Sequence, residues 1–237
     1  MRILAIETSA KAASVAITDG EKIESFAFQN RGLTHSRTLM PMVRDALRNA
    51  DLEIGDVDVI AAASGPGSFT GLRIGVAAAK GIAWSAQKPG IGVSTLEAMA
   101  RVVAHIPGIV CCVMDARRGE YYNAIFESDG RELKRVCEDR AVPLDDLEQD
   151  LASNDRQITL VGDGAPSAFS GLKSKIPNIA LAPPHLMHQS AIGVAFAASE
   201  AYQNKSQDSP HDLSSLNPVY IRRPQAERER LEREQAL

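Results

Sequence analysis

A glycine-rich stretch is the first place where this sequence could do chemistry. Residues 64–81 read SGPGSFTGLRIGVAAAKG, with an apolar run before them and helical composition after. Backbone N–H groups at such a helix start can hold an anion. The stretch fits no standard phosphate loop, because Gly71 is followed by LR rather than the Lys and Ser/Thr of Walker A, and Thr70 replaces the third glycine of the dinucleotide fingerprint. Because Gly67 directly precedes Ser68, the GxSxG nucleophile motif also fails.

Two interpretations of this stretch therefore remain open. In one, it binds the phosphates of a ligand. In the other, Gly-Pro-Gly makes a turn, Ser68 or Thr70 caps the helix, and the small residues that follow let another helix approach closely. The physical chemistry of the residues slightly favours the second interpretation.

Two acidic residues follow apolar strands and could help to bind a cation or phosphate. Glu7 follows the apolar residues of ILAIETS, and Asp115 follows the apolar residues of IVCCVMD. The turn after Asp115 is charged, with Arg117, Arg118 and Glu120, which is typical either of a solvated hairpin or of a subunit contact.

The remaining reactive side chains give weak signals. His185 and His188 have HxxH spacing, but two prolines precede them and no acidic or thiolate partner is near in sequence, so we predict no metal site. Cys111, Cys112 and Cys137 form no CxxC motif, and we expect them to be buried packing residues. No HExxH motif and no nucleophile–base pair supports a peptidase.

Composition indicates a globular cytoplasmic protein. The 237 residues are 44% hydrophobic and 24% charged, and no apolar run reaches the roughly 18 residues of a membrane span. The short apolar stretch at the N-terminus is typical of a buried strand rather than of a secretory leader. The net charge of −4 gives no electrostatic reason to bind nucleic acid alone. Residues 222–237 interleave Arg and Glu and are typical of a solvated helix or frayed end, a docking tail being the alternative.

The pattern of elements indicates a duplicated α/β protein. Apolar strands are predicted at residues 2–9, 13–20 and 22–29, with a turn at Asp19-Gly20, and another strand at 58–64. Helices are predicted at 34–50, 72–86, 95–104, 144–151 and 190–203, with a strand and turn at 158–165. Residues 109–136 repeat the opening pattern, with Asp115 in the place of Glu7 and a second Asp-Gly turn. Two related halves with a boundary near residue 106 follow from this repeat.

An ordered set of motifs carries a family resemblance over essentially the whole chain. ILAIETS, HSRTLMPMV, SGPGSFTGLRIGVAAAKG, GVSTLEAMA, DARRGEYY and NPVYIRR together closely resemble the TsaB (YeaZ) family. The resemblance implies an α/β, actin-like ASKHA (ribonuclease H-like) fold with two duplicated lobes, residues 1–106 and 107–221, followed by the charged tail. It also implies a subunit of the bacterial machinery that makes threonylcarbamoyladenosine next to the tRNA anticodon.

The resemblance also predicts what this chain lacks. The catalytic paralogue of the family, TsaD, carries two metal-binding histidines four residues apart, and the matching positions here are Thr95 and Met99. A hydroxyl and a thioether hold a divalent ion poorly, so we expect neither metal nor catalytic residues nor cofactor. Any nucleotide binding would be vestigial and weak, through Glu7, Thr8, Ser9, Gly67 and Ser68. The segment Gly162-Asp163-Gly164 is either a relic of an adenosine contact or a simple turn.

By this resemblance the chain is a non-catalytic scaffold that pairs with TsaD, helps recruit the ATPase TsaE, forms a homodimer when alone, and meets tRNA only within the complex. The predicted interface lies on the helices of the first half and comprises His35, Leu39, Met42, Val43, Leu47, Phe69, Arg73, Ile74, Ala77 and Ala78. The alternative is an actin-like nucleotide hydrolase or kinase that uses Glu7 and the loop at residues 65–71.

Overall fold

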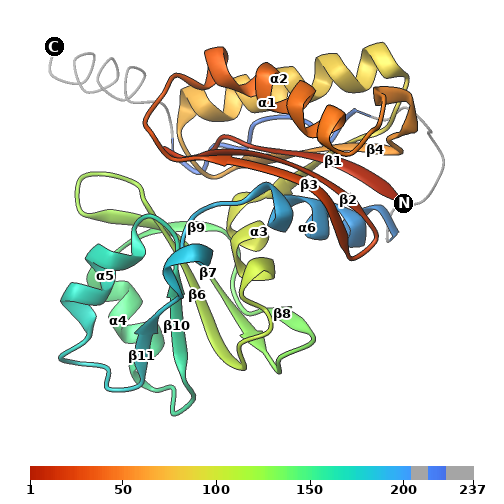
Figure 1. Ribbon diagram of the computed structural model, residues 1–237. Helices are drawn as coiled ribbons and strands as arrows, with labels where there is room; N and C mark the ends of the chain where they lie inside the picture. The colour runs from red at the N-terminus through yellow and green to blue at the C-terminus, as the bar shows by residue number, and fades with distance from the viewer. Residues whose placement is uncertain (204–212, 223–237) are drawn as a thin grey trace, which may run out of the picture.

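The first sheet brings Glu7 and the glycine-rich loop to one edge. The computed structural model describes residues 1–203 and 213–222, so the predicted tail, apart from Arg222, lies outside them. Five strands, ordered β3-β2-β1-β4-β5, form this sheet (Figure 1): β1 (Arg2–Glu7), β2 (Ala13–Asp19), β3 (Lys22–Gln29), β4 (Val59–Gly65) and β5 (Gly90–Ser94). Because β1 and β4 are parallel neighbours, their carboxyl ends lie side by side.

Two layers of helices cover this sheet. The helices α1 (His35–Asn49) and α2 (Phe69–Ala86) pack on one face, and the short 3₁₀ helix η1 (Ile54–Asp56) lies between them in the chain. On the other face lie α3 (Thr95–Val102) and α6 (Ala191–Gln203), which separate the first sheet from the second (Figure 1). The predicted helix at 72–86 begins three residues earlier, because the hydroxyl of Ser68 caps it by accepting from the Gly71 N–H.

The second sheet repeats the strand order of the first. Its strands run β11-β10-β6-β7-β8, and β9 pairs with β7. They are β6 (Gly108–Asp115), β7 (Glu120–Ser128), β8 (Leu133–Arg135), β9 (Arg140–Pro143), β10 (Ile158–Val161) and β11 (Ile179–Leu181); α4 (Leu144–Ala152), α5 (Ala165–Leu172) and the 3₁₀ helix η2 (Pro184–Leu186) complete the lobe. Since β6-β7-β8 correspond to β1-β2-β3, the predicted duplication is confirmed at the level of topology.

The lobes exchange helices across the predicted boundary near residue 106. The side chains of Leu96 and Met99 in α3 join the core of the second lobe, whereas Val194 and Ala198 in α6 join the core of the first sheet. Residues 213–219 also pack on the first lobe, while Arg222 reaches the second. The two sheets are therefore built from separate halves of the chain, but the helices that cover them are not.

Several local predictions are confirmed. The hydroxyl of Ser94 accepts from the Glu97 N–H at 3.1 Å and caps α3. Cys111 and Cys112 are buried, and burial raises the pKa of the Cys111 thiol to about 12, so both are packing residues.

Across residues 1–203 and 213–222, no helix is both long and apolar enough to span a membrane.

Candidate functional site

The glycine-rich loop is filled by the end of β1. The Ser68 N–H donates to the Ser9 carbonyl at 2.6 Å, and the Thr8 hydroxyl donates to the Gly71 carbonyl at 2.8 Å. A Cβ on Gly67 would lie 2.5 Å from the Ser9 carbonyl oxygen, and one on Gly71 would lie 2.1 Å from that of Thr8. These glycines admit the chain's own backbone, and at least one loop N–H that could face an anion is already paired.

Glu7 is buried directly beside this packed loop. Its side chain has no exposed surface, and one carboxylate oxygen, Oε1, accepts from the Ser9 N–H at 2.5 Å. Within the described part of the chain, the other oxygen, Oε2, has no hydrogen-bond partner, and neither does the buried Ser9 hydroxyl. Burial raises the pKa of Glu7 to about 7, and the negative charge of Asp163 in the second lobe adds to the rise. A carboxyl with a pKa of about 7 is half neutral near pH 7, so its charge depends on pH in the physiological range.

Asp163 extends this region into the second lobe. Its Oδ1 accepts from the Gln189 side-chain amide at 2.7 Å. Its pKa is raised because neighbouring atoms desolvate the carboxylate, although the residue is exposed to solvent. The segment Gly162-Asp163-Gly164 connects β10 to α5, and the charge of Asp163 reaches Glu7, one of the predicted vestigial residues. Whether they bind a nucleotide stays a prediction.

The positions that match the metal-binding histidines lie in the protein interior. Thr95 is fully buried at the start of α3, and Met99 is 1% exposed with its methyl group against Gly162.

His188 contacts Asn30 through Nε2 at 3.3 Å, and the centre of its ring lies 6.3 Å from that of the Phe28 ring. Among the described residues, no group of three His, Cys, Asp or Glu side chains is arranged to hold a metal ion.

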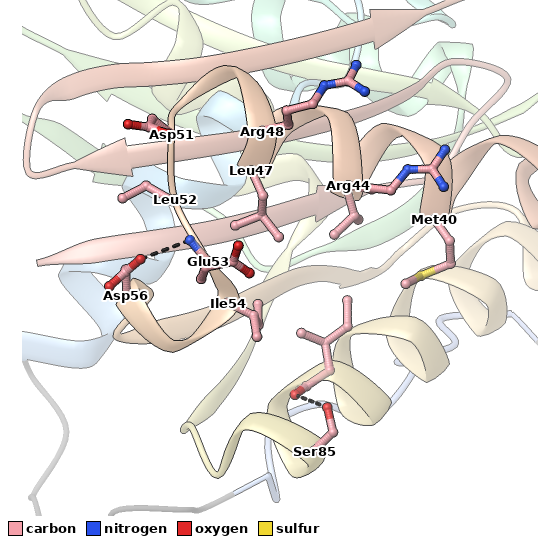
Figure 2. A pocket seen from close by; sticks show the side chains of 12 residues that line it. Met40, Arg44, Leu47, Arg48, Asp51, Leu52, Glu53, Ile54, Asp56 and Ser85 are labelled. Carbon is pink, nitrogen blue, oxygen red and sulfur yellow. Dashed lines mark hydrogen bonds between the residues drawn. The ribbon is translucent and has the colours of Figure 1, made fainter.

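The outer faces of α1 and α2 form a second candidate site, a groove that we call the helical groove. It has a volume of about 580 Å³ and is lined by α1, the segment containing η1, and α2 (Figure 2). Leu47, Leu52, Ile54 and Ile82 contribute apolar side chains. Charged side chains flank them: Arg44 and Arg48 project from α1, and the acidic ones are Asp51, Glu53 and Asp56. A surface of this kind, with apolar walls and both signs of charge, fits a protein partner better than a phosphate ligand.

The structure divides the predicted interface residues into three groups. Leu39 and Val43 are 1% and 4% exposed and pack in the core. Val43 also lines the helical groove, whereas Leu39 does not. Ala77 and Arg73 lie exposed on α2. The others are half-buried: His35, Met42, Leu47, Phe69, Ile74 and Ala78. The ring of His35 contacts the Ala10 carbonyl, 2.8 Å from Nε2.

Three exposed side chains on this face escaped the sequence-based prediction. Met40 on α1 is 50% exposed and lines the helical groove, and Trp84 on α2 is 79% exposed. Tyr220 packs its ring 5.0 Å from that of Phe69, and its hydroxyl accepts from Arg73 Nε at 3.0 Å. Met40 and Trp84 lie outside the apolar core-facing positions of their helices, and this spacing is visible in the sequence as a sign of exposure. The place of Tyr220 depends on contacts almost 150 residues away in the chain, which leave no local signal.

Comparison with known sequences identifies relatives over most of the chain. The family model described as "TsaD: tRNA N6-adenosine threonylcarbamoyltransferase" matches residues 32–229. The TsaB threonylcarbamoyladenosine biosynthesis protein of Bacillus subtilis is 35% identical over 68% of this chain and 71% of its own length. The TsaB protein of Escherichia coli is 42% identical over 54% of this chain and 56% of its own length, so this second match spans only about half of each protein.

Solved structures agree with the sequence comparison. A YeaZ structure from Pseudomonas aeruginosa covers 92% of this chain and 99% of its own, with a TM-score of 0.73 and 26% identity. Component A of (R)-2-hydroxyglutaryl-CoA dehydratase from Acidaminococcus fermentans has a TM-score of 0.50 at 13% identity, covering 85% of this chain and 99% of its own, a likeness that concerns the fold alone. The fold is the actin-like, two-lobed fold that the resemblance implied.

Proposed function

We propose, since this chain belongs to the TsaB (YeaZ) family, that it is the non-catalytic scaffold of the assembly that forms N6-threonylcarbamoyladenosine on tRNA. In this role it pairs with the transferase TsaD and helps to recruit TsaE in the cytoplasm, and it meets tRNA only within the complex. The observation that carries the proposal is the filled glycine loop together with an exposed helical groove elsewhere on the same lobe: the place for a phosphate ligand is occupied by the chain itself, and the open surface is suited to a protein.

The buried positions of Thr95 and Met99 support the non-catalytic part of the proposal. A hydroxyl and a thioether at these positions offer no imidazole to a divalent metal. The alternative of a nucleotide hydrolase or kinase relies instead on Glu7 and the loop at residues 65–71, and that loop is packed against Thr8 and Ser9 of the chain itself.

The helical groove supports the pairing part of the proposal. Met40, 50% exposed on α1, lines this groove, and large exposed apolar side chains are typical of interaction sites. The match to the TsaD family model over residues 32–229 indicates a related fold for the proposed partner. Two related folds can offer similar helix pairs to each other, so a homodimer and the pair with TsaD would compete for the same surface.

An omission assay tests this function. Purified TsaD, TsaE, the threonylcarbamoyl donor and a substrate tRNA are combined with or without this chain, and modified adenosine is measured by mass spectrometry of the digested tRNA. We expect product only when both TsaD and this chain are present, and no ATP turnover by this chain alone. Undiminished product without this chain, or ATP turnover by it alone, would contradict the proposal and favour the hydrolase alternative.

A further inference from the structure

Residues 213–222, which we call the C-terminal strap, connect the start of α2 to the second lobe. The strap begins in the core of the first lobe, where Leu216 is fully buried and Leu213 packs beside it. It then passes over the ends of β4 and β5 and reaches the β6–β7 hairpin at its last described residue, Arg222. It therefore touches both lobes within ten residues.

The first lobe has a dedicated seat for the strap. The Val219 N–H donates to the Ser64 carbonyl at 2.7 Å, and the Ser215 hydroxyl donates to the Gly90 carbonyl at 3.2 Å. A Cβ on Gly65 would lie 2.2 Å from the Val219 carbonyl oxygen, and one on Gly92 would lie 2.2 Å from that of Ser215. Since only glycine at positions 65 and 92 leaves room for the strap backbone, these contacts fix the path of the strap.

At the start of α2 the strap becomes part of the exposed surface. The guanidinium of Arg73 stacks 3.8 Å from the centre of the Phe69 ring, and Tyr220 contacts both residues. A cation held over an aromatic ring, with a hydrogen bond to a second aromatic residue, is more rigid than any of the three side chains alone. Phe69 and Arg73 are also predicted partner contacts, so a partner that binds there would meet Tyr220 as well.

Two residues further on, the strap binds the second lobe. Arg222 donates to the Ala116 carbonyl at 3.0 Å and forms an ion pair with Glu120. Both partners lie in the β6–β7 hairpin, whose tip holds Arg117 and Arg118 in the left-handed region, with φ of 64° and 57°. Non-glycine residues adopt that conformation only when surrounding contacts impose it, and the strap supplies contacts on each side of the tip.

We propose that the C-terminal strap couples the α2 end of the partner surface to the β6–β7 hairpin of the second lobe. A partner that orders Phe69, Arg73 and Tyr220 also orders Arg222 and the hairpin. By thermodynamic linkage, the factor by which the partner favours the ordered hairpin equals the factor by which ordering the hairpin raises the affinity for the partner. The coupling within the chain stands by itself, and its regulatory use rests on the proposed function.

Hydrogen–deuterium exchange on the isolated full-length chain tests the coupling, with each variant measured at the far end of the strap. We expect Tyr220→Ala to give several-fold faster exchange at residues 116–120, and Arg222→Ala to give several-fold faster exchange at residues 68–73 and 219. Phe26→Ala, which truncates an exposed aromatic residue on β3 outside the proposed partner surface, is the matched control and should change neither region. If each substitution affects only its own end, the coupling is overturned.

A second experiment adds TsaD as the probe. We expect TsaD to slow exchange at residues 116–120 of the wild-type chain, and we expect this protection to be lost in Arg222→Ala. Bound TsaD that protects both chains equally at these residues would contradict the regulatory use of the strap. If TsaD does not bind at all, the proposed function fails, while the exchange of the isolated chain still decides whether the strap couples the lobes.

Discussion

At the scale of single residues, Glu7 and the glycines near it explain why a phosphate-loop pattern can make a packed turn. The glycine spacing that suggests anion binding serves instead to admit Thr8 and Ser9. Sequence alone leaves both interpretations open, because glycine allows a close approach of backbone in either case. Only the three-dimensional structure shows which backbone makes the approach.

Replacing Glu7 by glutamine should change how stability depends on pH. Burial raises the pKa of Glu7 from 4.5 to about 7 in the folded state, so the folded state holds this proton more tightly. The contribution of Glu7 to the unfolding free energy is therefore largest below pH 4.5, falls as the pH rises to about 7, and is constant above, a total of up to about 3 kcal/mol. We expect Glu7→Gln to lose this slope and to exceed wild-type stability at pH 8. Urea unfolding at pH 5 and pH 8 measures the difference, and a variant less stable than wild type at pH 8 would disprove this explanation.

Two glycines of α2 provide a matched pair for the packing argument. A Cβ on Gly75 would lie 2.2 Å from the Thr8 hydroxyl, whereas one on Gly81 meets no atom within 4 Å. We expect Gly75→Ala to lower the unfolding free energy by about 1–3 kcal/mol through overpacking. Gly81→Ala should raise it by roughly 0.5–1 kcal/mol, since alanine is the better helix former. Equal effects in denaturant titrations would show that β1 does not press against α2 as described.

At the scale of elements, the sequence predicted those with strong periodicity. The strands of the two hairpins and the helices α1, α2, α3, α4 and α6 follow from apolar spacing and caps. The eight-residue α5 was missed because APSAFSGL is too short and too apolar to show a face, and the three-residue strand β11 carries no pattern. The equally short β8 was predicted only because it completes the repeat of the opening pattern. The strap was missed because residues distant in the chain determine its path. Of the candidate site, the glycine loop and the helix pair were predictable, but the groove between the helices was not.

A charge placed in the helical groove should weaken assembly. Met40 is half exposed there, so Met40→Glu costs no core packing but puts a carboxylate into the apolar part of the proposed interface. We expect self-association and TsaD binding to weaken by about tenfold or more, the usual effect of removing one important contact. Val136→Glu, an equally exposed apolar residue in the second lobe, is the control. Sedimentation velocity measures both, and equal affinities for the two variants would argue against the groove as the contact.

At the scale of the whole molecule, two lobes of matching topology share helices and are tied together by α3, α6 and the strap. Because the core of each lobe includes a helix from the other half of the chain, the lobes are packed together rather than joined by a linker alone. This packing fixes the relative position of the two lobes, which suits a protein that acts as a scaffold for a partner.

Light scattering coupled to size exclusion, on this chain alone, on TsaD alone and on their mixture, decides whether the proposed pairing exists. We expect a homodimer of this chain that gives way to a complex with TsaD, because both use the surface of α1 and α2, and we expect Met40→Glu to weaken both species. A stable complex with TsaD in which the homodimer contact of this chain persists unchanged, or a mixture in which no complex forms, would contradict this expectation.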